Sequence, residues 1–332
     1  MSCDGNAYLL VGTLVVSEYL FHRLNNLLMH AFGRSVPSNC IVKIKGHINS
    51  IHECSFSNDR RFLATASADH SVRLWNVDSH QCIATLKDHT SWVYSCKFSP
   101  DDTLVASASW DETVRLWDVK SHRCIATLNG HRDYVYGCAF SVDGKVLASV
   151  SDDTTVRFWN MKTFMNISTL RGHTESVCGC DTSRDAIVAS TCGDKTVRLW
   201  DMNTQQCITV LNGHTHWSNK CCFTADGTLL ASTSNDCTVR LWDMRTRRHI
   251  ATLKDESCGT YQSSFSSDGG WIAAACYHDK VARVWDTKTL RCIATLQHDY
   301  WVRACSFSSN GMIATAGGLY GSDEDYAVHL WQ

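Results

Sequence analysis

The 332-residue sequence predicts an all-β fold in which one unit of four strands is repeated seven times in a closed ring. Two recurring residues carry this prediction. A His that opens the unit recurs about every 42 residues, with one double interval, at His47, His89, His131, His173, His214 and His298. A Trp that closes the unit follows the same interval at Trp75, Trp117, Trp159, Trp200, Trp242, Trp285 and Trp331. A period of roughly 40 to 45 residues is typical of the four-stranded blades of a β-propeller.

Each unit contains four short apolar or β-branched runs separated by turn residues. In the second unit these runs are WVYSCKF, LVASAS and TVRLW, followed by CIATL at 124–128. Runs of this kind, alternating with turns such as SPDD, predict antiparallel strands. A single blade cannot bury both of its faces, so we expect the blades to pack side by side around the ring.

Two short motifs mark the ends of the units. Gly-His pairs stand at Gly46-His47, Gly130-His131, Gly172-His173 and Gly213-His214, and Trp-Asp pairs stand at Trp117-Asp118, Trp200-Asp201, Trp242-Asp243 and Trp285-Asp286. With these motifs the chain resembles the WD40-repeat family from residue 40 to its C-terminus. The resemblance implies a seven-bladed WD40 β-propeller.

The two ends of the repeat region predict how the ring closes. The last unit stops directly after its third strand, AVHLW at 327–331, and CIVKIK at 40–45 reads as a fourth strand with no first three before it. We therefore expect 40–45 to complete the last blade, since an open ring would expose an unpaired strand edge. The resemblance implies the same closure. The blades are predicted at about 48–86, 90–128, 132–170, 174–211, 215–253 and 257–296, with the seventh made of 299–332 plus 40–45.

Residues 1–39 form a separate N-terminal segment. The run AYLLVGTLVVSEYLF at 7–21 and the spacing of the apolar residues after it predict a short helical segment, acting as a cap or as a docking site for a partner. Poorly ordered sequence and a targeting signal are the alternatives. The longest uncharged run is shorter than the roughly 20 residues that span a bilayer, so membrane insertion is not expected.

Charge and cysteine content narrow the class of protein. A net charge of −2 gives no basic field for nucleic acid, so nucleic-acid binding is not expected. The 18 cysteines follow the repeat and are interpreted as small buried residues in a reducing compartment, cytoplasmic or nuclear. No CxxC pair is present, and neither a metal nor a cofactor is predicted.

The recurring polar residues are predicted to be structural. In the resembled family, a His, a strand Ser or Thr, a tight-turn Asp and the Trp form a hydrogen-bonded tetrad in each blade. The matching positions are His47, Thr65, Asp69 and Trp75; His89, Ser107, Asp111 and Trp117; His131, Ser149, Asp153 and Trp159; His173, Ser190, Asp194 and Trp200; and His214, Ser232, Asp236 and Trp242. The seventh blade offers His298, Thr315, Asp325 and Trp331. The sixth retains only Asp279 and Trp285, with Glu256 and Ala275 at the other two positions, and is expected to be the loosest blade.

Repetition argues against catalysis by these groups. A hydrolytic triad of Ser, His and Asp needs one site with an exposed nucleophile, whereas a set that recurs in most blades satisfies buried polar groups. No catalytic residue is therefore predicted. A propeller enzyme would need groups that break the pattern, and the only candidates, His52, His216 and His278, lie in three blades without a common spacing.

Function is expected at the narrow face of the ring. In WD40 domains this face displays the third and fifth residues after the His and the residue before the tight-turn Asp. The candidate binding residues are His52, Trp92, Tyr94, Trp110, Tyr134, Tyr136, Asp152, Trp217, Tyr261, His278, Trp301 and Arg303. Aromatic residues and Arg dominate binding hot spots, so we interpret this set as an interface.

The sequence predicts two alternative functions. The first is a non-enzymatic scaffold, a monomeric propeller within a multiprotein complex, that binds a protein segment at the narrow face. Because Trp92, Tyr94, Trp110, Tyr134 and Tyr136 fall on adjacent blades, they are expected to form one patch that holds a basic or methyl-lysine side chain by cation–π attraction. The alternative is a substrate receptor of a cullin-RING ubiquitin ligase, because Trp242-Asp243-Met244-Arg245 resembles the WDxR box of such receptors.

Overall fold

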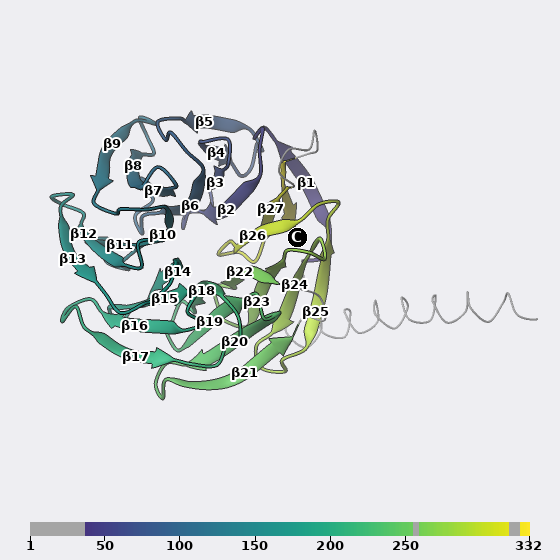
Figure 1. Ribbon diagram of the computed structural model, residues 1–332. Coiled ribbons are helices and arrows are strands. Elements are labelled where there is room, and N and C mark those ends of the chain that lie inside the picture. Colours follow the sequence, from purple (N-terminus) through teal and green to yellow (C-terminus); the bar gives the residue numbers. More distant parts are fainter. Residues whose placement is uncertain (1–36, 255–258, 319–325) are drawn as a thin grey trace, which may run out of the picture.

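The computed structural model describes residues 37–254, 259–318 and 326–332, which form seven antiparallel sheets of four strands each. The sheets stand around a central opening as the blades of a propeller (Figure 1). The predicted all-β seven-bladed fold is confirmed. The expected N-terminal helix falls in a segment of which residues 1–36 lie outside the described residues. Within the described ranges, no helix is long and apolar enough to cross a membrane.

The two inner strands of each blade are six residues long in all blades except the seventh. The innermost strands surround the central channel and are β2 (Ile51–Phe56), β6 (Val93–Phe98), β10 (Val135–Phe140), β14 (Val177–Thr182), β18 (Ser218–Phe223), β22 (Thr260–Phe265) and β26 (Val302–Phe307). The second strands are β3 (Phe62–Ser67), β7 (Leu104–Ser109), β11 (Val146–Ser151), β15 (Ile187–Cys192), β19 (Leu229–Ser234), β23 (Trp271–Cys276) and β27 (Ile313–Gly317).

The two outer strands complete each blade. The third strands, which carry the closing Trp, are β4 (Val72–Asn76), β8 (Thr113–Asp118), β12 (Val156–Asn160), β16 (Val197–Asp201), β20 (Thr238–Asp243), β24 (Val281–Asp286) and β28 (Ala327–Trp331). The rim strands are β5 (Cys82–Leu86), β9 (Cys124–Asn129), β13 (Asn166–Leu170), β17 (Cys207–Leu211), β21 (Arg248–Lys254), β25 (Cys292–Gln297) and β1 (Cys40–Lys45).

The ring is closed by the strand that comes first among the described residues. Strand β1 pairs antiparallel with β28, with Cys40 opposite Trp331 and Lys45 opposite Ala327. The seventh sheet therefore has the order β1-β28-β27-β26, and Figure 1 shows the purple β1 beside the yellow C-terminal strands. This confirms the predicted closure.

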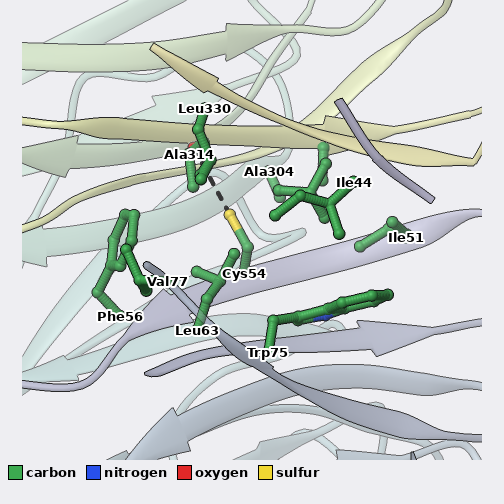
Figure 2. Close-up of a cluster of buried hydrophobic side chains, with 12 residues drawn as sticks. Ile44, Ile51, Cys54, Phe56, Leu63, Trp75, Val77, Ala304, Ala314 and Leu330 are labelled. Atoms are coloured by element: carbon green, nitrogen blue, oxygen red, sulfur yellow. Dashed lines mark hydrogen bonds between the residues drawn. The ribbon is translucent and has the colours of Figure 1, made fainter. Parts of the chain in front are cut away.

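The hydrophobic core is divided among the interfaces between neighbouring blades. At the closing interface, Trp75 of blade 1 packs in one cluster with Ile44 of β1 and Leu330 of β28 (Figure 2). The Cys54 thiol, which is fully buried there, donates a hydrogen bond of 3.6 Å to the carbonyl of Ala314 in blade 7. Burial of a large apolar side chain stabilises a fold by about 1.5–3 kcal/mol, so every such interface holds its two blades together.

Each innermost strand carries an irregularity close to its first residue. In β6 the pairing with β7 passes from Val93 directly to Ser95, so Tyr94 is left out of register. The residues skipped in this way are His52, Tyr94, Tyr136, Cys178, Asn219, Lys220, Tyr261, Gln262 and Arg303. A β-bulge of this kind redirects a side chain. In blades 5 and 6 two residues of the innermost strand are skipped in the pairing with the second strand, and in the other blades one residue is.

Candidate functional site

The tetrad of the first blade is a continuous hydrogen-bonded chain. Trp75 Nε1 donates to Thr65 Oγ1 at 2.8 Å, Thr65 lies 2.7 Å from His47 Nε2, and His47 Nδ1 lies 2.7 Å from Asp69 Oδ2. An ionised carboxylate only accepts, so Nδ1 carries the proton and the Thr65 hydroxyl donates to Nε2. A Cβ on Gly46 would come within 2.8 Å of the Trp75 ring, which explains the Gly of the Gly-His pair.

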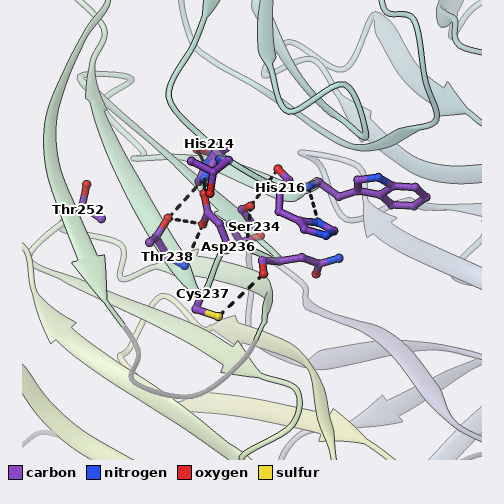
Figure 3. A network of polar contacts seen from close by, with 12 residues as sticks. His214, His216, Ser234, Asp236, Cys237, Thr238 and Thr252 are labelled. Carbon is purple, nitrogen blue, oxygen red and sulfur yellow. Dashed lines mark hydrogen bonds and ion pairs between the residues drawn. The ribbon is translucent and has the colours of Figure 1, made fainter.

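The structure brings the same four groups together in blades 2 to 5. The His–Asp distances are 2.7–2.9 Å, the His–Ser distances 2.7–2.8 Å and the Trp–Ser distances 2.8–2.9 Å. Figure 3 shows His214 and Asp236 of blade 5, where Thr238 also donates to Asp236.

The pKa values of the tetrad groups fit a structural role. Burial lowers the pKa of His47, His89 and His131, so these imidazoles are neutral. Although burial acts against it, the hydrogen bond from His47 holds the pKa of the Asp69 carboxyl well below its usual value. Each Ser or Thr hydroxyl is fully buried between His and Trp. No hydroxyl of this set is placed to act as a nucleophile.

The sixth blade departs from this pattern, whereas the described residues of the seventh follow it. In blade 7, Thr315 accepts from Trp331 at 2.7 Å and lies 3.0 Å from His298, whose ring stacks on His329 at 4.4 Å. In blade 6, Asp279 pairs with Arg283 at 3.3 Å, and Ala275 supplies no hydroxyl. The candidates Asp325 and Glu256 lie outside the described residues.

One group of potential metal ligands lies inside the blade-4 tetrad. The side chains of His173, Cys192 and Asp194 place one ligand atom each within 4.8 Å of one another. Cys192 stands where blade 1 has Ser67, and its thiol donates to the Glu175 carbonyl and accepts from the Asp194 amide. Burial raises the pKa of this thiol. The Cys192 thiol therefore makes the same two hydrogen bonds as the Ser67 hydroxyl of blade 1.

On blades 1 to 3 the narrow face carries a continuous set of stacked rings, the aromatic stack, consisting of His52, Trp92, Tyr94, Trp110, Tyr134 and Tyr136. Trp110 stacks on Trp92 with 4.4 Å between the ring centroids and on Tyr134 with 4.6 Å between the ring centroids. Tyr94 stacks on buried His52 at 4.2 Å and meets the edge of Tyr136 at 5.1 Å. The five predicted rings thus lie together, and the faces of Trp110 and Tyr94 are turned toward other rings.

On blades 4 to 7 the same face is hollow, and the hollow reaches Tyr94 and Tyr136 of the aromatic stack. The first mouth cavity, of about 210 Å³, is lined by Tyr94, Tyr136, Cys178, Trp217, Asn219, Lys220, Asn235 and Tyr261. The second mouth cavity, of about 410 Å³, is lined by His216, Asn235, Gly259, Tyr261, Tyr277, His278 and Arg303. Trp217, in the lining of the first cavity, is 45% exposed. Asn219 donates to Asn235 at 2.7 Å and to the Thr260 carbonyl at 2.8 Å, which fixes the partition between the cavities.

The second mouth cavity also contains an internal cation–π contact. The Arg303 guanidinium lies 4.5 Å from the Tyr277 ring centroid and 5.7 Å from that of Tyr261, and it donates to the Tyr277 hydroxyl at 2.6 Å. Trp301 packs against Tyr277 at 4.4 Å. His278 and His216 line this one cavity although their sequence spacing did not group them. Asp152 lies in neither lining, and its carboxylate accepts from the Ser176 hydroxyl.

A buried charge network under the mouth was missed at the sequence level. Glu53, 2% exposed, lies 2.7 Å from Lys97 and 3.5 Å from Lys220, and it accepts from Gln262 at 3.1 Å. Burial would raise the pKa of Glu53, but the two ammonium groups lower it overall. The network links blades 1, 2, 5 and 6 across the channel. Its signal in the sequence is a long polar side chain at one repeat position, Glu53, Lys220 and Gln262, where the other blades have Ser95, Gly137, Gly179 and Ala304.

Comparison with known families agrees with this architecture. The family model described as WD domain, G-beta repeat matches residues 38–76, 80–118, 122–160, 164–201, 205–243, 247–286 and 290–332. The chain therefore belongs to the WD40 family, whose propellers typically serve as scaffolds for protein interactions. A search of curated proteins gave no match.

Proposed function

We propose that this WD40 propeller is a non-enzymatic scaffold that binds a segment of a partner protein at its narrow face. The observation that carries the proposal is the pair of mouth cavities. The exposed ring of Trp217 lines the first, Tyr277 lines the second, and Tyr261 lines both. Sites of this kind, concave and mainly aromatic with a few fixed polar groups, are where ligands bind.

The proposal places the contact on blades 5 to 7, with Tyr94 and Tyr136 at its edge. The sequence favoured a basic side chain held between the rings of blades 1 to 3. In the aromatic stack, however, the ring faces pack on one another, so a cation would have to displace a neighbouring ring. In the second mouth cavity, Arg303 already occupies the cation position over Tyr277.

A random peptide library displayed on phage and panned against the purified chain tests this function. Selected peptides should bind the wild-type chain and should lose at least about tenfold in affinity to Trp217→Ala and to the double variant Tyr94→Ala/Tyr136→Ala. Ile250→Ala is the matched control, because Ile250 is 52% exposed on the rim strand of the same blade as Trp217. Failure to select any peptide, or equal binding by Trp217→Ala, would contradict the proposal.

A substrate receptor of a cullin-RING ligase is the second candidate function. Arg245 is exposed in the β20–β21 turn beside exposed Arg247 and Arg248, where an adaptor could reach it. Asp243 accepts hydrogen bonds from Thr246 and shapes this turn. Copurification of a ligase adaptor that is lost in Arg245→Ala, but kept in Arg247→Ala, would favour this function. Copurification that is indifferent to Arg245 would oppose it.

We further propose a cytoplasmic or nuclear location. All 16 cysteines in the described ranges are free thiols, several of them exposed on rim strands. Exposed thiols persist in reducing compartments. Fluorescence microscopy of the tagged full chain tests this, and a secreted product would contradict it.

A further inference from the structure

Of the residues that the structure describes, Lys220 is the one lysine that lines the first mouth cavity. It comes from the wide bulge of β18, and only 7% of the residue is exposed. Its neighbours in the bulge are fixed, because Thr191 donates to the Asn219 carbonyl at 2.9 Å and the Lys220 amide donates to Thr233 at 3.1 Å. The ammonium is therefore held in place by the fold.

The charges around Lys220 leave positive charge at the mouth. Glu53 is shared between two ammonium groups and lies closer to Lys97, at 2.7 Å, than to Lys220, at 3.5 Å. The other contact of Lys220 is the Tyr136 carbonyl at 3.0 Å, which carries no net charge. Asp181 accepts from the Phe223 amide and lines a separate cavity deeper in the channel, together with Glu53, Lys97 and Lys220. Neither carboxylate lines the first mouth cavity.

The walls of the first mouth cavity suit one inserted side chain. Tyr94 and Tyr261 come from opposite sides of the channel and join through their hydroxyls at 2.9 Å, which closes one side. The cavity of about 210 Å³ has the size of a single side chain. The adjoining second mouth cavity contains a further cation, Arg303. A basic side chain in the first mouth cavity would therefore meet the like charge of Lys220, and a buried charge is tolerated only when it is paired.

We propose that the first mouth cavity binds an acidic side chain of the partner segment, with its carboxylate on Lys220 and its methylene groups between Tyr136, Trp217 and Tyr261. This specificity rests on the proposed function. It reverses the sign of the ligand expected from the aromatic residues alone. A Lys ammonium has three donors, so a carboxylate can bind it without breaking its contacts to Glu53 and Tyr136.

The test uses peptides selected on the full chain. An Ala scan of each peptide identifies the residue whose replacement costs most affinity. The peptide is then resynthesised with Glu, Gln, Lys or trimethyl-lysine at that position. The Glu peptide should bind about tenfold more tightly than the Gln peptide, and the Lys and trimethyl-lysine peptides more weakly still. Lys220→Met should abolish the preference for Glu over Gln, whereas Lys220→Arg should keep it. Lys145→Met is the matched control, because it also removes one ammonium group, but its side chain is 80% exposed and does not line the mouth.

Different outcomes would contradict the proposed peptide binding and the acidic specificity. No selectable peptide would remove the proposed function itself. Selected peptides that bind through Trp217 but show equal affinity with Glu and Gln, or prefer Lys or trimethyl-lysine, would overturn only the acidic specificity. Thermal unfolding establishes that each variant folds, and if Lys220→Met does not, the four wild-type affinities decide by themselves.

Discussion

The narrow face is built differently on its two sides. On blades 1 to 3 aromatic side chains pack on one another, as Trp110 does on Trp92 and Tyr134, and the tetrads beneath them are complete. On blades 5 to 7 the rings line two cavities, the first of which extends to Tyr94, Tyr136 and Cys178 of blades 2 to 4. The inner strands of blades 5 and 6 leave their register over two residues, and the sixth blade has Ala275 where a tetrad hydroxyl would be. Aromatic residues at equivalent repeat positions thus stabilise one side and leave the other open for binding.

The largest effect is expected from the tetrad of a complete blade. Ser107 bonds both His89 and Trp117, so Ser107→Ala leaves two buried groups unsatisfied and should lower the free energy of unfolding by about 2–4 kcal/mol. Urea denaturation measures this. A decrease in the free energy of unfolding below about 0.5 kcal/mol would show that the tetrads contribute little to stability. The complete tetrads of blades 1 to 3 would then not make that side more stable than the other.

Replacement within the aromatic stack should act on stability rather than binding. Trp110→Ala removes a half-buried ring that stacks on two others and should cost about 2 kcal/mol of unfolding free energy. Affinity for a selected peptide should remain within about twofold of wild type. A loss of affinity comparable to that of Trp217→Ala would place the ligand on the stack and reverse the comparison.

The pH dependence sharpens the comparison at blade 7. Burial, together with the stacked His329 and nearby Lys43, lowers the pKa of His298 to about 3, while Asp299 acts in the opposite direction. Since this lies below the unfolded value, neutral His298 contributes stability at neutral pH, and this contribution is lost as the pH falls from about 6.5 toward 3. The loss is about 1.4 kcal/mol per pH unit. His298→Gln should flatten the pH dependence by this amount, and unchanged curves would contradict it.

The smallest stability effect is expected at the open side. Trp217→Ala should change the free energy of unfolding by no more than about 0.5 kcal/mol, because nearly half of the residue is exposed. Thermal and urea unfolding of Trp217→Ala, with Ile250→Ala as the control, measure the change in the free energy of unfolding. A loss equal to that of Trp110→Ala would mean that Trp217 is a packing residue like those of blades 1 to 3.

The repeat fixed most of the architecture in advance. The His and Trp intervals predicted seven blades, and the unmatched run at 40–45 predicted the closing strand, because an incomplete blade has an identifiable missing part. The tetrads could be located because their four residues recur at constant offsets. Patterns that repeat are visible in a single sequence.

What the sequence did not reveal depends on features that do not repeat. The wider bulges of β18 and β22 leave no periodic mark, and no spacing in the sequence shows that Lys220 and Gln262 meet Glu53 across the channel. Residue spacing predicted that the rings of Trp92 to Tyr136 would gather, but it could not show whether their faces meet each other or solvent. The sign of the ligand charge was inferred from ring type alone, without the buried ammonium beneath the rings.

Hydroxyl-radical footprinting of the chain with and without its tightest selected peptide tests the central claim most directly. We expect the peptide to protect Trp217, Tyr277 and Trp301 and to leave the oxidation rates of Trp92 and Trp110 unchanged. Protection of Trp92 and Trp110, with Trp217 unaffected, would contradict the assignment of binding to blades 5 to 7.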